Sequence, residues 1–251
     1  MFSLSGKRAL VTGGSRGIGG ATSRLLAQCG ADVVVHFRSR REVAEAMAAD
    51  VRALGRRCLV IAAELANRAA VDAMFEHVRS EWGGIDLFVG NAGIWPEADV
   101  PVSDMPDERW GRTVAENIDG MFYSTRGALR IMADGGRVVL VSSTAGQRGE
   151  AMHADYAASK GAMIAFTKSV AIEVARRGIT VNSVAPGWVD TEMCDGTFAG
   201  GGRARVAAGI PVGRVATPAD IAAPIAFLCA DEARHVTGEV LNVNGGSVLC
   251  G

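Results

Sequence analysis

The chain has 251 residues, of which 49% are hydrophobic, and its formal net charge is −1. This length and apolar content are enough for a sizeable core, and α/β folds of this size are commonly single domains. A charge near zero without a basic stripe or a Lys/Arg cluster argues against nucleic acid and against a membrane surface as partners.

The apolar runs are strand-sized and far shorter than a membrane-spanning helix. The first residues also lack the long apolar stretch of a signal peptide, so we expect a cytoplasmic protein. Five cysteines are widely spaced, without a C-x-x-C pair: Cys29, Cys58, Cys194, Cys229 and Cys250. This pattern predicts neither a disulfide framework nor a metal site.

Short β-branched runs alternate with longer helical stretches along the whole chain. The expected strands are 8–12, 32–37, 57–62, 86–90, 137–142, 179–184 and 239–243. The expected helices are 17–29, 40–54, 67–82, 107–133, 154–177 and 217–230. Runs such as 138–141 are apolar throughout, which is typical of strands buried on both faces. The alternation predicts an α/β fold, a single domain over 1–251 with a parallel sheet and helices on both faces.

A glycine-rich turn follows the first expected strand, with Gly13, Gly17 and Gly19. Glycines there allow a close backbone approach to a pyrophosphate, and the next helix offers free N–H groups and a positive dipole end. The spacing G-x-x-x-G-x-G differs from the common G-x-G-x-x-G fingerprint, and a plain turn is the alternative. The strand before it and the helix after it favour a dinucleotide site.

The end of the second expected strand indicates which dinucleotide binds. Phe37 stands where an enzyme that prefers NAD usually has an acidic residue for the ribose 2′-hydroxyl. Arg38 follows it, and Arg16 lies in the glycine-rich turn. Two arginines without the carboxylate favour a 2′-phosphate, hence NADP(H), with NAD(H) still possible. The alternative is that Arg38 is one of several solvated arginines.

Tyr156 and Lys160 lie four residues apart on an expected helix and therefore on one face of it. An ammonium near a phenol favours the phenolate, so we expect a lowered Tyr156 pKa. A shift from about 10 to about 7 corresponds to roughly 4 kcal/mol. Such a tyrosine can exchange a proton with a carbonyl or hydroxyl oxygen. Ser142 and Ser143 end the strand 137–142, and Ser142 is expected to point away from the site.

In combination, these features resemble the short-chain dehydrogenase/reductase family over essentially the whole chain. The matching residues are Thr12-Gly13 through Gly19, Asn91-Ala92-Gly93, Asn117, Ser143, Tyr156, Lys160, Pro186-Gly187 and Thr191. The resemblance implies a Rossmann-type doubly wound domain, with a seven-stranded sheet in the order 3-2-1-4-5-6-7. It also implies an oxidoreductase that acts on CH–OH groups.

The resemblance assigns four catalytic roles. Tyr156 would be the general acid in reduction, and Ser143 would hydrogen-bond the substrate carbonyl. Lys160 would lower the tyrosine pKa and bind the nicotinamide ribose. Asn117 would hold a water that links Lys160 to solvent, the alternative being a helix-surface residue.

Cofactor contacts are expected in the glycine-rich turn and at or after the ends of several expected strands. They are Gly13, Ser15, Arg16, Gly17, Ile18, Gly19, Arg38, Glu64, Leu65, Asn91, Ala92, Gly93, Tyr156, Lys160, Pro186, Gly187, Val189 and Thr191. Glu64 stands where the family usually has an aspartate near the adenine, and Asn91 is expected to tie strands rather than catalyse. Family members usually add hydride from the pro-S face.

Four loop residues join Ser143 as expected substrate contacts: Trp95, His153, Trp188 and Met193. An apolar lining with one imidazole suits a medium-sized ketone or alcohol. Packing of the loop bases is the alternative for Trp95 and Trp188, gap filling for Met193, and a surface position for His153. The segment 190–212 is expected to be a mobile substrate loop, with 196–202 as a lid hinge or a tolerated loop.

The closest resemblance is to 3-oxoacyl-(acyl-carrier-protein) reductases. Arg177 matches one of the cations expected near their active-site mouth, whereas Asp134 stands in place of a basic run and disfavours an acidic partner. The alternatives are a sugar or cyclic-alcohol dehydrogenase using NAD(P) and a non-catalytic nucleotide-binding protein. The resemblance further implies a homotetramer or homodimer formed through 107–133, 154–177 and the last strand.

Overall fold

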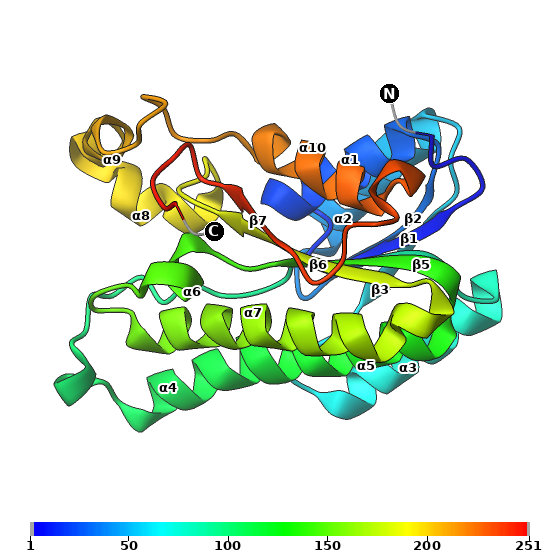
Figure 1. Cartoon of the computed structure of the whole chain (residues 1–251), viewed down its shortest axis with the longest axis horizontal. Coiled ribbons are helices and arrows are strands. Elements are labelled where there is room, and N and C mark those ends of the chain that lie inside the picture. The colour runs from blue at the N-terminus through cyan, green and yellow to red at the C-terminus, as the bar shows by residue number, and fades with distance from the viewer. Residues whose placement is uncertain (1–2, 250–251) are drawn as a thin grey trace.

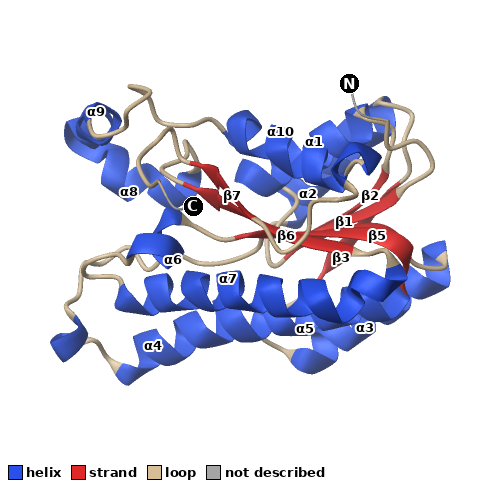
Figure 2. Cartoon of the chain, viewed as in Figure 1, coloured by secondary structure: helices blue, strands red, loops and turns tan. Residues whose placement is uncertain are grey.

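The seven predicted strands join into one parallel sheet in the computed structural model, which describes residues 3–249 (Figures 1 and 2). They are β1 (Arg8–Val11), β2 (Asp32–Phe37), β3 (Cys58–Ala62), β4 (Ile85–Gly90), β5 (Met132–Val141), β6 (Thr180–Pro186) and β7 (Val240–Val243). Their order is β3-β2-β1-β4-β5-β6-β7, as expected. The chain reverses its direction of travel across the sheet after β3, so β1 and β4 flank the switch point where open α/β sheets bind ligands.

Helices cover both faces of this sheet (Figure 1). The helices on one face are α1 (Gly17–Gln28), α2 (Arg41–Ala53) and α10 (Pro218–Cys229), and those on the other are α3 (Arg68–Trp82), α5 (Gly120–Ile131) and α7 (Ala154–Val174). Successive strand residues point to opposite faces. Val33 and Val35 of β2 accordingly join the core under α1, α2 and α10, whereas Val34 joins the core under α3, α5 and α7.

The helix predicted over 107–133 is interrupted. α4 (Asp107–Val114) passes into a π-helical turn, Ala115–Asp119, before α5 begins. Met132 leaves the helical region with φ −78° and ψ 134° and starts β5, five residues earlier than predicted. A π turn widens one turn of helix and is frequent at functional sites; here it contains Asn117.

The segment after β6 is a series of short helices rather than one open loop. It contains α8 (Asp195–Phe198), a turn over Ala199–Gly201 and α9 (Gly202–Ala208). Gly200 and Gly201 have φ of 56° and 82°, the left-handed region that favours glycine. The backbone conformation of this turn therefore explains why glycines occupy positions 200 and 201.

Two further findings bear on the expectations from composition. Cys29, Cys58, Cys194 and Cys229 are free thiols, and Cys250 lies outside the described residues. Over residues 3–249, none of the helices combines the length and the apolar character needed to cross a membrane.

Candidate active site

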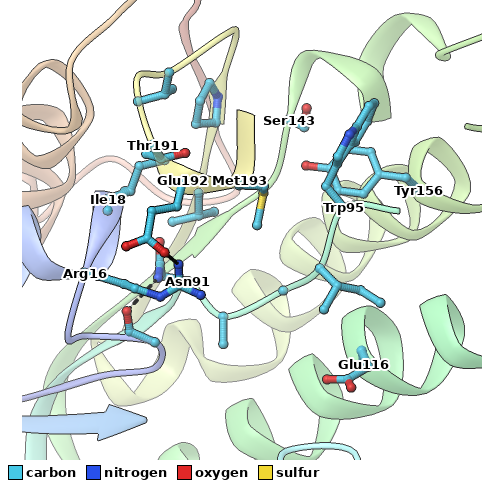
Figure 3. A pocket seen from close by; sticks show the side chains of 18 of the residues that line it. Arg16, Ile18, Asn91, Trp95, Glu116, Ser143, Tyr156, Thr191, Glu192 and Met193 are labelled. Carbon is cyan, nitrogen blue, oxygen red and sulfur yellow. Dashed lines mark hydrogen bonds and ion pairs between the residues drawn. The ribbon is translucent and has the colours of Figure 1, made fainter. Parts of the chain in front are cut away.

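A cavity of about 550 Å³ opens at the carboxyl edge of the sheet (Figure 3). It runs from the turn after β1 to the loops after β4, β5 and β6. The expected site residues that line it are Gly13, Ser15, Arg16, Gly17, Ile18, Arg38, Glu64, Leu65, Asn91, Ala92, Gly93, Trp95, Ser143, Tyr156, Lys160, Pro186, Gly187, Trp188, Val189, Thr191 and Met193. Gly19, Asn117 and His153 are not among the described residues of its lining.

The glycine-rich turn has the shape that a pyrophosphate requires. Gly13 and Gly17 have φ of 60° and 54°. A Cβ on Gly19 would lie 2.2 Å from the Gly13 carbonyl oxygen, so Gly19 keeps the turn tight without lining the cavity. α1 starts after Arg16 without a side-chain cap, which leaves its first N–H groups and its positive end available to an anion.

Asn91 ties strands together, as expected. Its Nδ2 donates to the Thr12 carbonyl oxygen at 3.0 Å. The Thr12 hydroxyl oxygen in turn accepts from the N–H groups of Asn91 and Ala92 at 2.9 and 3.0 Å. These bonds join the ends of β1 and β4 at the switch point.

His36 is a site residue that the sequence analysis missed. It lies in β2, lines the cavity and is only 2% exposed. Its Nδ1 accepts from the Gly13 N–H at 3.1 Å, and its Nε2 donates to the Ala63 carbonyl oxygen at 3.0 Å. Burial lowers the His36 pKa, which fits the neutral tautomer that both bonds require. An imidazole inside an apolar strand needs such partners, and that was the available signal.

The predicted phosphate-binding arginines are paired with carboxylates across the cavity. Arg38 donates to Glu116 at 2.6 Å and lies 3.9 Å from Glu64. Glu192 accepts from Arg16 in an ion pair (Figure 3). It also accepts from Arg40, which the sequence analysis did not predict, at 2.8 Å. All of these side chains line the cavity.

Tyr156 and Ser143 converge from different elements. Ser143 caps α6 (Thr144–Arg148), and its Oγ accepts from the Ala145 N–H at 3.1 Å. Its hydroxyl lies beside the Tyr156 phenol and opposes part of the rise in the Tyr156 pKa (Figure 3). Ser142 also lines the cavity, but its hydroxyl donates to the Lys160 carbonyl oxygen at 2.9 Å. Ser143 follows the end of β5 and Tyr156 lies near the start of α7 (Ala154–Val174), so the two side chains meet at the carboxyl edge of the sheet.

The Tyr156 pKa differs from the expectation. Burial raises it to about 12, and the hydrogen bond from Ser143 opposes this only in part. Burial also lowers the Lys160 pKa to about 8. The Lys160 ammonium lies 5.7 Å from the Tyr156 ring centroid and donates to the Val141 carbonyl oxygen at 2.8 Å. Desolvation is the largest cause of both shifts, because each group is almost fully buried.

Asn117 is buried, not on the helix surface. Its Oδ1 accepts from the Ile94 N–H at 2.8 Å, and its Nδ2 donates to the Ile94 carbonyl oxygen and to Ser159 Oγ, both at 3.0 Å. Gly93 adjoins it, and a Cβ there would lie 3.1 Å from Asn117 Oδ1 and 3.5 Å from Lys160 Nζ. Asn117 thus fastens the loop after β4 to the stretch of α7 between the tyrosine and the lysine.

Of the expected substrate contacts, Trp95, Trp188 and Met193 line the cavity and His153 does not. Trp95 packs edge-to-face on Tyr156, with centroids 4.7 Å apart at 82° (Figure 3). His153 is buried behind Trp95, and the two rings stack at 3.9 Å and 13°. His153 is therefore neither a surface residue nor a direct substrate contact. It packs against Trp95, which does line the cavity.

Arg177 lies away from the cavity. It precedes β6 and donates to Asp134 at 2.9 Å and to the Met132 carbonyl oxygen at 2.6 Å, at the amino ends of β5 and β6. The active site is at the carboxyl ends of the same strands. Within one chain, Arg177 is therefore no cation at the mouth of the site.

Comparison with known proteins agrees with this geometry. Residues 13–247 match the family profile described as Enoyl-(Acyl carrier protein) reductase. A 3-oxoacyl-(acyl-carrier-protein) reductase of Vibrio cholerae is 41% identical over 252 residues, covering 99% of this chain and all of the relative.

Two solved structures are similar throughout. A blue fluorescent protein from a metagenomic library, in complex with NADPH, is 36% identical with a TM-score of 0.91, covering 98% of this chain and 100% of that one. A short-chain dehydrogenase/reductase from Serratia marcescens is 36% identical with a TM-score of 0.92, covering 97% of this chain and 98% of that one. The chain belongs to the short-chain dehydrogenase/reductase family.

Proposed function

We propose that this chain transfers hydride between NADP(H) and a carbonyl or secondary alcohol, with Tyr156 as the general acid and base. One observation carries the proposal. The Tyr156 phenol, with the Ser143 hydroxyl beside it, lines the same cavity as the glycine-rich turn and the uncapped start of α1. A proton donor and a dinucleotide-binding turn therefore line the same cavity.

In the reduction direction, the bound nicotinamide supplies hydride to the carbonyl carbon. Ser143 donates a hydrogen bond to the carbonyl oxygen, and Tyr156 transfers its phenolic proton to that oxygen. The raised pKa of Tyr156 keeps the phenol protonated at neutral pH, which is the form that reduction needs. Lys160 would hold the nicotinamide ribose, and its ammonium would serve as the proton reservoir for Tyr156. Asn117 fixes the loop and helix around this route and holds the water that connects it to solvent.

NADP(H) is the cofactor that the end of β2 fits best. Phe37, and no carboxylate, ends the strand, and Arg16, Arg38 and Arg40 line the cavity beside it. Guanidinium groups bind phosphate in a bidentate manner. The similarity to a protein solved with NADPH supports the same choice. Lys160, Pro186, Gly187, Val189 and Thr191 would hold the nicotinamide end.

Among substrates, 3-oxoacyl thioesters are supported by the names of the most similar relatives. The position of Arg177 gives no support for docking an acidic carrier protein at the mouth of the site within one chain. We further propose a single cytoplasmic domain that forms a homotetramer, with a mobile segment over 190–212.

The test is the initial rate of NADPH oxidation with an acetoacetyl thioester, run beside NADH. Turnover with NADPH and little with NADH would support both the cofactor and the thioester proposals. A preference for NADH would contradict the cofactor choice. Cofactor binding without turnover would exclude acyl thioesters and direct the search to ketones, sugars and cyclic alcohols.

A further inference from the structure

Aromatic rings form a corner on the substrate side of the cavity. The indoles of Trp95 and Trp188 lie 6.1 Å apart at 74°, and Phe198 of α8 packs on Trp188 at 6.1 Å. Trp95 comes from the loop after β4 and Trp188 from the loop after β6. Because the two indoles are nearly perpendicular, an aromatic ring bound between them could pack on the face of one and against the edge of the other. Aromatic pairs prefer these offset-stacked and edge-to-face arrangements.

This corner lies beside the reacting group. The Trp95 centroid is 4.7 Å from that of Tyr156, and Figure 3 shows the two rings together with Ser143 close by. When Tyr156 and Ser143 hold a carbonyl oxygen, one of the two groups on the carbonyl carbon would therefore lie close to Trp95. Met193, 45% exposed, lines the cavity as well and adds a polarizable apolar surface.

Trp95 is held rigidly from behind. His153 is 4% exposed and stacks on Trp95 at 3.9 Å. Its Nε2 donates to the carbonyl oxygen of Pro96, the next residue after the tryptophan, at 2.8 Å. The ring of His153 thus fixes both the indole and its backbone, and it cannot reach a substrate itself.

Two carboxylates line the cavity near the tyrosine. Glu150, which is paired with Arg148 at 3.0 Å, raises the Tyr156 pKa slightly, and Glu97 is also in the lining. A free carboxylate or phosphate next to the reacting carbonyl would meet these like charges. A neutral substituent meets only the rings.

We propose that this site prefers a neutral substrate with an aromatic ring attached to the reacting carbonyl, recognised by Trp95 and Trp188, with His153 as the positioning residue for Trp95. The proposal rests on the proposed function and names its substrate class. It is compatible with a 3-oxo ester or thioester whose ketone carries an aryl group.

Two neutral 3-oxo esters isolate aromaticity from size. Ethyl benzoylacetate carries a phenyl group on the ketone, and ethyl 3-cyclohexyl-3-oxopropanoate carries a saturated ring of similar size. The measured quantity is the ratio of their kcat/KM values with NADPH, compared between variants so that the intrinsic reactivity of each ketone cancels. We expect Trp95→Leu to lower the phenyl-to-cyclohexyl ratio by about 3- to 10-fold relative to the unmodified protein.

Trp110→Leu is the matched control. Trp110 is a 45% exposed tryptophan of α4 that is not among the described lining residues, so the ratio should stay unchanged. For the positioning role, His153→Ala should lower the ratio, and His153→Phe, which keeps a ring against Trp95, should restore most of it.

The outcomes separate the two proposals. A ratio that stays within twofold in Trp95→Leu, with both esters turned over, would overturn the aromatic preference. Equal ratios in His153→Phe and His153→Ala would overturn the positioning role, provided both variants keep the unfolding midpoint of a folded protein. No NADPH oxidation with these esters or with an acetoacetyl thioester, despite NADPH binding, would overturn the whole 3-oxo substrate class and the aromatic preference with it, and failure to bind NADPH would refute the proposed function instead.

Discussion

The cofactor side and the substrate side of the cavity are held together by different interactions. On the cofactor side, Arg38 pairs with Glu116 and Arg16 with Glu192, and three of these four side chains are about half exposed, Glu116 being 18% exposed. Such pairs contribute about 0–1 kcal/mol. On the substrate side, Asp155, the neighbour of Tyr156, has a side chain with 0% exposure and pairs with Arg109, which is 13% exposed.

The buried pair organises several segments at once. Asp155 accepts from Arg109 Nε at 3.1 Å and from the Thr113 hydroxyl at 2.8 Å. Arg109 also donates to the carbonyl oxygens of Ala98, at 2.5 Å, and Met152, at 3.2 Å. These bonds connect the loop after β4, α4 and the start of α7. The comparison indicates that buried bonds fix the part of the substrate side around Trp95 and Tyr156. On the cofactor side, Arg16 and Arg38 can exchange their carboxylate partners for a phosphate.

The largest expected effect is at Tyr156, where the two sides meet. Tyr156→Phe keeps the ring packed on Trp95 and removes the transferable proton. We expect turnover to fall about 10²- to 10⁴-fold, while NADPH fluorescence titration shows less than a tenfold change in Kd. A variant with more than half of the original turnover would contradict the catalytic assignment.

Next in size is the stability difference between the buried and the exposed pairs. Arg109→Met leaves a buried carboxylate without its partner and should lower the free energy of unfolding by about 3–5 kcal/mol. Arg38→Met, at an exposed pair, should change it by less than about 1 kcal/mol. Urea unfolding of both variants measures this, and similar losses in the two would refute the contrast.

Cofactor choice tests the exposed side. Arg38→Gln should reduce the NADPH-to-NADH preference in kcat/KM by about 10- to 100-fold, because a charge-assisted bond to the phosphate is lost. Arg24→Gln is the control, since Arg24 pairs with Asp50 and is not among the described lining residues. An unchanged preference in Arg38→Gln would show that this arginine does not read the 2′-phosphate.

A smaller effect is expected at Glu192, which competes with phosphate for Arg16 and Arg40. Glu192→Gln should tighten NADPH binding by about 1.4- to 5-fold, and the gain should shrink at 1 M salt. Glu76→Gln removes another exposed pair, with Arg79, as a control. Weaker NADPH binding in Glu192→Gln would mean that Glu192 assists the cofactor instead.

The pH dependence of NADPH binding should be the mildest test. Lys160, with a pKa of about 8, is cationic below that pH and neutral above it. The Kd for NADPH should therefore rise by a few-fold as pH passes upward through about 8, because an attractive charge is lost. Lys160→Met should lack this step. A step of equal size in Lys160→Met would assign it to another group.

The sequence analysis succeeded where the information is local. The continuous apolar run 138–141 predicted a strand buried on both faces, and the four-residue spacing predicted that Tyr156 and Lys160 share a face. It missed the partners of Arg16 and Arg109, which lie 176 and 46 residues away along the chain. Such pairs depend on the packed fold, and no local pattern marks them.

Two other misses have related causes. The π turn around Asn117 uses residues that are compatible with an ordinary helix, so helix propensity could not distinguish it. The Tyr156 pKa is raised because burial disfavours the charged phenolate, whereas the sequence analysis expected the nearby ammonium to lower it. The motif Tyr-x-x-x-Lys reveals the ammonium but not the degree of burial.

The most direct test of the central claim is to follow the hydride. The protein would be incubated with ethyl benzoylacetate and NADPH deuterated at the pro-S position of C4, and the alcohol analysed by mass spectrometry. We predict one deuterium on the carbinol carbon, with Tyr156→Phe forming little alcohol under the same conditions. Alcohol without deuterium from either pro-S- or pro-R-labelled NADPH would contradict hydride transfer from NADPH in this cavity.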